Sequence, residues 1–176
     1  PILREHAVLL IYKILKDEKP AIRTYIPFSD VKTSDSTFEA IHWAYEAGII
    51  DGTNGKFNPK DFVTREQMAK ILVNAFNLNE NGNYAITDVS STHWSYPYIN
   101  TLRAHNLTNL YQNQYFPLLQ TKRGEMASFL VRTVDYTKIE LKPVTKIITP
   151  PSTSVPEQLT GTLYDAGWDM KWQVLD

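Results

Sequence analysis

The sequence predicts a mainly α-helical repeat domain, and three observations agree on this. Matching residues recur in register at an offset of 58 positions, the separation between Asp30-Val31 and Asp88-Val89. Within each repeat, apolar residues recur at helical spacing, and turn-forming residues separate the periodic segments. Neither helix of a unit can bury its apolar face alone, so we expect three units to close around a shared core.

The first two helices are indicated by local start and stop signals. Leu3-Arg4-Glu5 precedes an apolar helical stretch, as Thr64-Arg65-Glu66 does later in the chain. Ser36 and Glu39 have the spacing of a capping box, and Gly48 ends the second periodic segment. These signals predict helices from Arg4 to Leu15 and from Thr37 to Ala47.

The remaining three helices follow from the same signals and from the repeat. Thr64 and Gln67 form a second predicted capping box, which opens a helix with an apolar face. The 58-residue offset carries this pattern into the last third of the chain, where Met126 matches Met68. The predicted helices run from Arg65 to Phe76, from Pro97 to His105 and from Arg123 to Thr133.

These elements divide the chain into five predicted parts. Residues 1–27 are the second half of a first repeat, residues 28–85 a full second repeat and residues 86–137 a full third one. Prolines among threonines and serines predict a linker over residues 138–158. Alternating Trp168, Met170, Trp172 and Val174 predict a short β-hairpin, or the start of a cargo domain, over residues 159–176.

Bulk composition excludes several classes of protein. The 18 Lys and Arg residues balance 19 Asp and Glu residues, which argues against nucleic-acid binding. The absence of cysteine excludes a disulfide framework and thiolate metal sites. No apolar run is long enough to insert into a membrane. Because Pro1 leads directly into a helical pattern without a signal peptide, we expect the chain to begin inside a larger protein.

The ordered motifs of the second repeat resemble an S-layer homology (SLH) repeat. They are Phe28-Ser29-Asp30-Val31, Ala40-Ile41, Gly48-Ile49-Ile50-Asp51-Gly52, Gly55-Lys56-Phe57-Asn58-Pro59 and Thr64-Arg65-Glu66. The third repeat resembles the same family through Thr87-Asp88-Val89, His93-Trp94 and the segment from Arg123 to Ala127. The resemblance covers roughly the first 135 residues, and a pattern found twice in register is a strong signal.

The resemblance implies a fold, a location and a function. It implies a pseudo-threefold bundle in which one helix of each repeat forms a central spindle. It also implies a secreted bacterial protein in the cell wall or S-layer, with grooves between repeats that bind a pyruvylated secondary cell wall polysaccharide. The third repeat departs from the pattern, with Asn106 for Gly48, Leu110 for Gly52, Lys122 for Thr64 and Gly124 for Glu66. These changes predict an impaired groove there.

The candidate carbohydrate-binding residues follow from this resemblance and from simple chemistry. An arginine in the first turn of a helix lies at the positive end of the helix dipole and can bind a carboxylate through two parallel hydrogen bonds. Arg65 is the predicted main clamp, with Arg4 and Arg123 as counterparts in other grooves. Gly52 would allow close approach of a sugar to the backbone. The remaining candidates are Glu66, within the Thr64-Arg65-Glu66 motif, and the aromatic residues Trp43 and Trp94.

Each candidate residue also has a purely structural explanation. The arginines could pair with carboxylates at helix starts, the two tryptophans could be core residues, and the glycines could serve only as turn formers. A calcium loop from Asp51 is rejected, because Phe62 stands where a bidentate glutamate is needed. The histidines show no metal-binding spacing and no nucleophile motif occurs, so we expect no enzyme activity, metal or cofactor in this chain.

Two other functions stay open. The repeats could form contacts with neighbouring surface-layer subunits in a structural lattice, without binding saccharide. The chain could also be the anchor of a cell-wall hydrolase whose catalytic domain follows the linker.

Overall fold

The computed structural model describes residues 1–79 and 82–137, and the regular secondary structure of these residues is helical. The five helices are α1 (Arg4–Leu15), α2 (Phe38–Glu46), α3 (Arg65–Phe76), α4 (Tyr96–Ala104) and α5 (Arg123–Thr137). They confirm the helices predicted from sequence, and α5 alone runs clearly past its predicted end. The predicted linker and β-hairpin lie outside the described residues.

A closed ring of backbone hydrogen bonds joins the three repeats. The N–H of Ile2 donates to the carbonyl of Thr121 (2.9 Å), Thr121 donates to Val63 (2.8 Å), and Val63 donates back to Ile2 (3.1 Å). Each of these residues stands two positions before a helix, so the N-terminal ends of α1, α3 and α5 meet around one axis. The pseudo-threefold arrangement expected from the repeats is therefore present.

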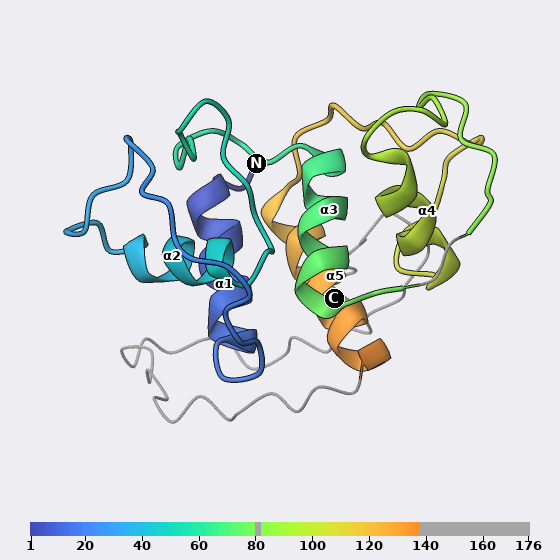
Figure 1. Cartoon of the computed structure of the whole chain (residues 1–176). Coiled ribbons are helices and arrows are strands. Elements are labelled where there is room, and N and C mark those ends of the chain that lie inside the picture. The colour runs from blue at the N-terminus through green and yellow to red at the C-terminus, as the bar shows by residue number, and fades with distance from the viewer. Residues whose placement is uncertain (80–81, 138–176) are drawn as a thin grey trace, which may run out of the picture. The chain divides into compact units, whose positions relative to one another are not determined.

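We call α1, α3 and α5 the spindle helices and α2 and α4 the outer helices. Each outer helix packs against the spindle helix of the preceding repeat: α2 lies against α1, and α4 lies against α3 (Figure 1). The spindle helices also supply much of one continuous apolar core, for example Ile11 of α1, Met68 of α3 and Met126 of α5. Burial of these faces is the main favourable contribution to the fold. None of the helices in residues 1–79 and 82–137 is long and apolar enough to cross a membrane.

The loop of each repeat is fastened by the aspartate that the 58-residue offset revealed. Asp30 accepts hydrogen bonds from the backbone N–H groups of Phe57 (2.8 Å) and Asn58 (2.7 Å). Asp88 makes the equivalent pair with Tyr115 (2.8 Å) and Phe116 (2.6 Å). Charge-assisted bonds of this kind are stronger than neutral ones, so they hold the loop against the body of its own repeat.

The loop carbonyls in turn cap the spindle helix of the preceding repeat. Those of Pro59 and Asp61 accept from the first turn of α1, and those of Pro117 and Leu119 accept from the first turn of α3. The first four N–H groups of a helix have no acceptor within the helix, so the loop carbonyls satisfy donors that would otherwise lack a protein partner. Loop and spindle of successive repeats therefore form one unit.

The turns of the second repeat carry residues suited to left-handed backbone, whereas the third repeat has Gln112 and Phe116 at two of the equivalent positions. Asn54 (φ 51°) and Gly55 (φ 72°) form the two-residue turn between Thr53 and Lys56. The same turn in the third repeat uses Gln112 (φ 49°) and Asn113 (φ 62°). A second left-handed position holds Asn58 in the second repeat and Phe116 in the third (φ 57° and 56°). The third repeat therefore carries more backbone strain.

One local prediction is wrong and one is confirmed. The capping box of Ser36 and Glu39 does not form, because α2 begins one residue later with Thr37 as its N-cap, and the Thr37 hydroxyl donates to Glu5 instead (3.3 Å). The Thr37 side chain therefore makes a tertiary contact and does not cap its own helix. The capping box of Thr64 and Gln67 is present in full.

Candidate functional site

A pocket of about 220 Å³ gathers residues from all three repeats, and we call it the Arg4 pocket. Arg4 comes from α1, the loop 49–53 from the second repeat, and Trp94 from the segment ahead of α4. Its full lining is Arg4, Ile49, Ile50, Asp51, Gly52, Thr53, Gln67, Lys70, Ile71 and Trp94. Three of the residues predicted from sequence, Arg4, Gly52 and Trp94, therefore meet in one place.

Arg4 is held in the pocket by contacts with the loop and the spindle helix of the second repeat. Its Nε donates to the carbonyl of Phe57 (2.9 Å), and its guanidinium lies 4.8 Å from the centre of the Phe57 ring. Its Nη1 donates to Oε1 of Gln67 (3.3 Å), the residue that caps α3. Burial lowers the pKa of Arg4, while Asp61 and Asp30 oppose this effect. An arginine remains charged at neutral pH despite such a shift, so the pocket holds a fixed cation.

A second cation lies at the rim of the pocket. Lys70 on α3 donates to Asp51 (2.8 Å), and Arg23 pairs with the same carboxylate (2.9 Å). Partial burial would raise the pKa of Asp51, but hydrogen bonds from Lys70 and Arg23 outweigh this effect and the pKa lies below its ordinary value. Asp51 is thus ionised and doubly paired. The charged lining consists of two cations and one satisfied anion, which favours an anionic guest.

Gly52 and Trp94 shape the pocket in different ways. A Cβ added to Gly52 would overlap the Phe28 ring and lie 2.7 Å from the carbonyl oxygen of Lys56. Glycine is therefore required here by packing within the repeat. Trp94 remains 45% exposed and lines the pocket. Exposed aromatic faces of this kind cover apolar C–H surfaces.

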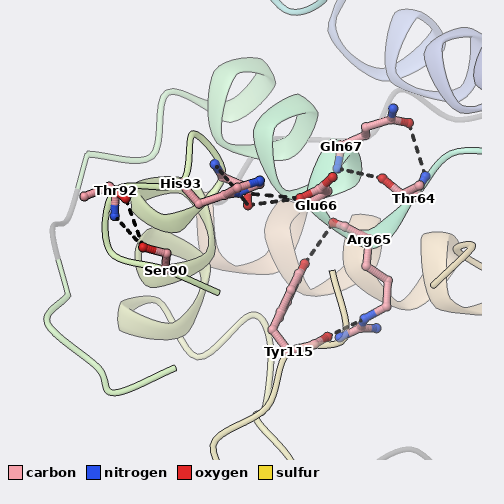
Figure 2. Close-up of polar contacts among 9 residues, drawn as sticks. Thr64, Arg65, Glu66, Gln67, Ser90, Thr92, His93 and Tyr115 are labelled. Carbon is pink, nitrogen blue, oxygen red and sulfur yellow. Dashed lines mark hydrogen bonds and ion pairs between the residues drawn. The ribbon is translucent and has the colours of Figure 1, made fainter. Parts of the chain in front are cut away.

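Arg65 occupies the equivalent place one repeat further along, and we call its surroundings the Arg65 position. Its Nε donates to the carbonyl of Tyr115 (3.0 Å), and its guanidinium lies 4.6 Å from the centre of the Tyr115 ring. The Tyr115 hydroxyl donates back to the carbonyl of Arg65 (3.0 Å), as Figure 2 shows. Arg65 is only 4% exposed and pairs with Glu125 (3.6 Å). The structure thus places the predicted main clamp in a buried internal contact.

Glu66 does not line the Arg4 pocket and instead contacts polar residues of the segment ahead of α4. It accepts from the hydroxyl of Ser95 (3.2 Å), and its carboxylate lies 3.8 Å from Nδ1 of His93 (Figure 2). Glu5 makes the equivalent contact with Thr37 and also pairs with Lys60. This recurrence indicates that Glu66 joins a spindle helix to the next repeat.

The last two sequence candidates lie elsewhere. Arg123 is exposed at the start of α5. Trp43 is half-buried on α2, packs edge-on against Tyr12 (5.4 Å between ring centres), and lines a different surface cavity of about 330 Å³. Neither residue reaches the Arg4 pocket.

Among the pocket residues that sequence reasoning did not assign to the site, Lys70, Asp51 and Gln67 matter most for its charge and for the position of Arg4. Lys70 lies on a helix face that the periodicity marked only as polar, and Asp51 was considered as part of a repeat motif and of a rejected calcium loop. Gln67 was identified only as a helix cap. A useful signal was available for Gln67, because its counterpart at the 58-residue offset is Glu125 and the change in charge is visible in the sequence. Among the described residues, no group of His, Cys, Asp or Glu could hold a metal ion.

Comparison with known proteins identifies the repeats. Residues 27–69 and 85–127 match the S-layer homology domain family. The two matched segments begin 58 residues apart, at positions 27 and 85, the offset found in the sequence.

Three relatives illustrate where such segments occur. The chain is 36% identical over 77 residues to an exoglucanase XynX of Acetivibrio thermocellus, covering 44% of this chain and 7% of the relative. It is 32% identical over 118 residues to an endoglucanase of Bacillus sp. (strain KSM-635), covering 65% and 12%. It is 32% identical over 102 residues to the Surface-layer 125 kDa protein of Lysinibacillus sphaericus, covering 57% and 9%.

The matches span about a tenth of the length of these relatives, so they concern the repeat domain and not the rest of those proteins. Within this chain the two matched segments share the loop aspartate and the arginine that begins a spindle helix. Residues 27–69 and 85–127 therefore belong to the S-layer homology family, whose domains are non-catalytic modules that anchor proteins at the bacterial cell surface.

Proposed function

We propose that this chain anchors its parent protein to the cell wall by binding a pyruvylated secondary cell wall polysaccharide in the Arg4 pocket. The convergence of Arg4, Lys70 and Trp94 carries this proposal. A pyruvyl ketal adds a carboxylate to a sugar, and the pocket offers two cations for the carboxylate and an indole for the ring. Each charge-assisted hydrogen bond contributes about 1.5–3 kcal/mol.

The proposal gives Arg4 the main role that the sequence assigned to Arg65, and it assigns no saccharide contact to the exposed Arg123. Arg4 uses Nε and Nη1 within the protein, and its Nη2 donates to no other described residue. This nitrogen and the Lys70 ammonium are the two donors available to a carboxylate. Gly52 contributes by keeping the loop in place, and Trp94 contributes the apolar face.

Calorimetric titration with a pyruvylated wall saccharide and its depyruvylated twin tests the proposal. We expect wild-type protein to bind only the pyruvylated form. Arg4→Lys should weaken binding by roughly tenfold or more, because lysine cannot reproduce the planar guanidinium contact. Lys70→Gln should weaken it as well.

The matched control is Arg123→Lys, which makes the same change at the exposed first residue of α5. It should bind like the wild type. Equal affinity for the two saccharides, or full affinity of Arg4→Lys in a protein that melts normally, would exclude the Arg4 pocket as the anchor site.

A specific surface favours a protein-contact role as a second candidate function. In the third repeat, Leu118 and Leu119 stand 74% and 58% exposed, next to the strained Phe116. The same turn in the second repeat carries polar Lys60 and Asp61 with the same backbone hydrogen bond. The fold therefore does not need these apolar side chains, and a second copy of the chain in a surface lattice would cover them.

Sedimentation velocity over a concentration series tests this second role. We expect the wild type to self-associate as its concentration rises, and Leu118→Lys/Leu119→Asp to stay monomeric, because that variant restores the polar turn of the second repeat. A wild type that stays monomeric throughout would remove the lattice contact. The relatives include both enzymes and a surface-layer protein by name, so the anchored parent can belong to either class.

A further inference from the structure

The two equivalent arginines differ in one contacting residue. Arg4 donates to Gln67, a neutral amide, whereas Arg65 pairs with Glu125, a carboxylate. Gln67 and Glu125 hold the same place in their repeats, the third residue of the next spindle helix. The two arginines share the bond from Nε to a loop carbonyl and the aromatic ring beside the guanidinium.

Glu125 is fixed where it stands. Its Oε2 accepts from the backbone N–H of Lys122 (2.7 Å), which caps α5, while its Oε1 faces Nη1 of Arg65. The carboxylate therefore cannot swing away without uncapping a helix. It presents to Arg65 the same chemical group that a pyruvylated sugar would present to Arg4.

Two further differences act in the same direction. Leu110 replaces Gly52 in the loop and is partly buried against the core, and Ser128 replaces Lys70 on the spindle helix. At the Arg65 position, the arginine is already paired with Glu125, and no lysine equivalent to Lys70 is present. An external carboxylate would have to displace Glu125 and then remain close to it, and two carboxylates near one cation repel each other.

We propose that Glu125 is an intramolecular carboxylate ligand that keeps Arg65 from binding wall saccharide, so that the Arg4 pocket is the only one of these two positions that takes an anion. The third residue of α3 and of α5 then determines whether the arginine of the preceding spindle helix can bind a ligand. Glutamine leaves the guanidinium available, whereas glutamate pairs with it. This inference rests on the proposed function and states how many of the two arginine positions bind saccharide, namely one.

Reciprocal exchange of the two residues tests the inference, because each variant installs a residue that the other repeat already accommodates. Gln67→Glu should pair with Arg4 and weaken binding of a pyruvylated amino-sugar methyl glycoside at least tenfold, while the helix cap is retained. The control Gln112→Glu makes the same change at an exposed turn and should leave affinity unchanged. The double variant Glu125→Gln/Leu110→Gly should gain a second, weaker site.

The arginine Nε–Hε resonances in ¹⁵N NMR spectra report each position separately. In the wild type, the Arg4 resonance should move with added saccharide and the Arg65 resonance should not. In Glu125→Gln/Leu110→Gly, both should move. Undiminished binding by Gln67→Glu, movement of Arg65 in the wild type, or a double variant with one site would each overturn the inference. A wild type in which Arg4 does not respond would instead overturn the proposed function.

Discussion

Replacing Arg65 by alanine should cost about 3 kcal/mol of folding free energy, since it removes one partner of a largely buried ion pair. The Tyr115 carbonyl would lose its donor inside the core, and Glu125 would keep its charge without the arginine. Glu125 is partly exposed, which keeps the loss at the low end for such pairs. A domain of this size should then melt on the order of 10 °C lower.

Arg123→Ala is the matched control for this experiment, because Arg123 holds the same helix position but is exposed. Its effect should lie within about 0.5 kcal/mol. Thermal unfolding followed by circular dichroism measures both variants. An Arg65→Ala protein that melts with the wild type would show that the contact with Tyr115 and Glu125 contributes no net stability.

Asp30→Ala should destabilise the fold by about 2–4 kcal/mol, because one carboxylate accepts two backbone hydrogen bonds. The N–H groups of Phe57 and Asn58 would lose their acceptor, and Phe57 is buried. Saccharide affinity should fall too, since the Phe57 carbonyl positions Arg4. Urea unfolding gives the free energy, and hydrogen exchange at the Phe57 amide should accelerate.

Asp35→Ala supplies the comparison for Asp30→Ala. The Asp35 carboxylate accepts one backbone hydrogen bond, from Lys32 (2.8 Å), in an exposed turn. Its loss should therefore cost well under half as much. Asp30→Asn keeps an acceptor oxygen and should fall between the two. Equal stability of Asp30→Ala and Asp35→Ala would contradict the role given to the loop aspartate.

Local sequence signals predicted the helices well, because helix starts and apolar stripes depend on neighbours within a few residues. The Thr64–Gln67 capping box is such a signal, and it is confirmed. The end of α5 was less predictable. Thr133 and Thr137 continue the helix by donating their hydroxyls to carbonyls one turn earlier, those of Phe129 (2.7 Å) and Thr133 (2.8 Å). Polar β-branched residues otherwise weaken a helical pattern.

The repeat also singled out residues before their structural roles were known. Asp30 and Asp88 were found as a matched pair, but nothing in the sequence indicated that each fastens its own loop. Trp94 and Gly52 were placed among the site residues, and both line the Arg4 pocket. Lys70 was missed, because Arg4 and Trp94, which line the same pocket, come from the other two repeats.

The sequence by itself determined the repeat, its 58-residue period, the helices and the family, since these depend on patterns along the chain. Only the tertiary structure decided which arginine faces a pocket. Arg4 and Arg65 have the same helix position and the same local motif, but their guanidinium groups meet Gln67 in one case and Glu125 in the other. Those partners lie about 60 residues away and reach the arginines only because the three spindle helices close into a ring.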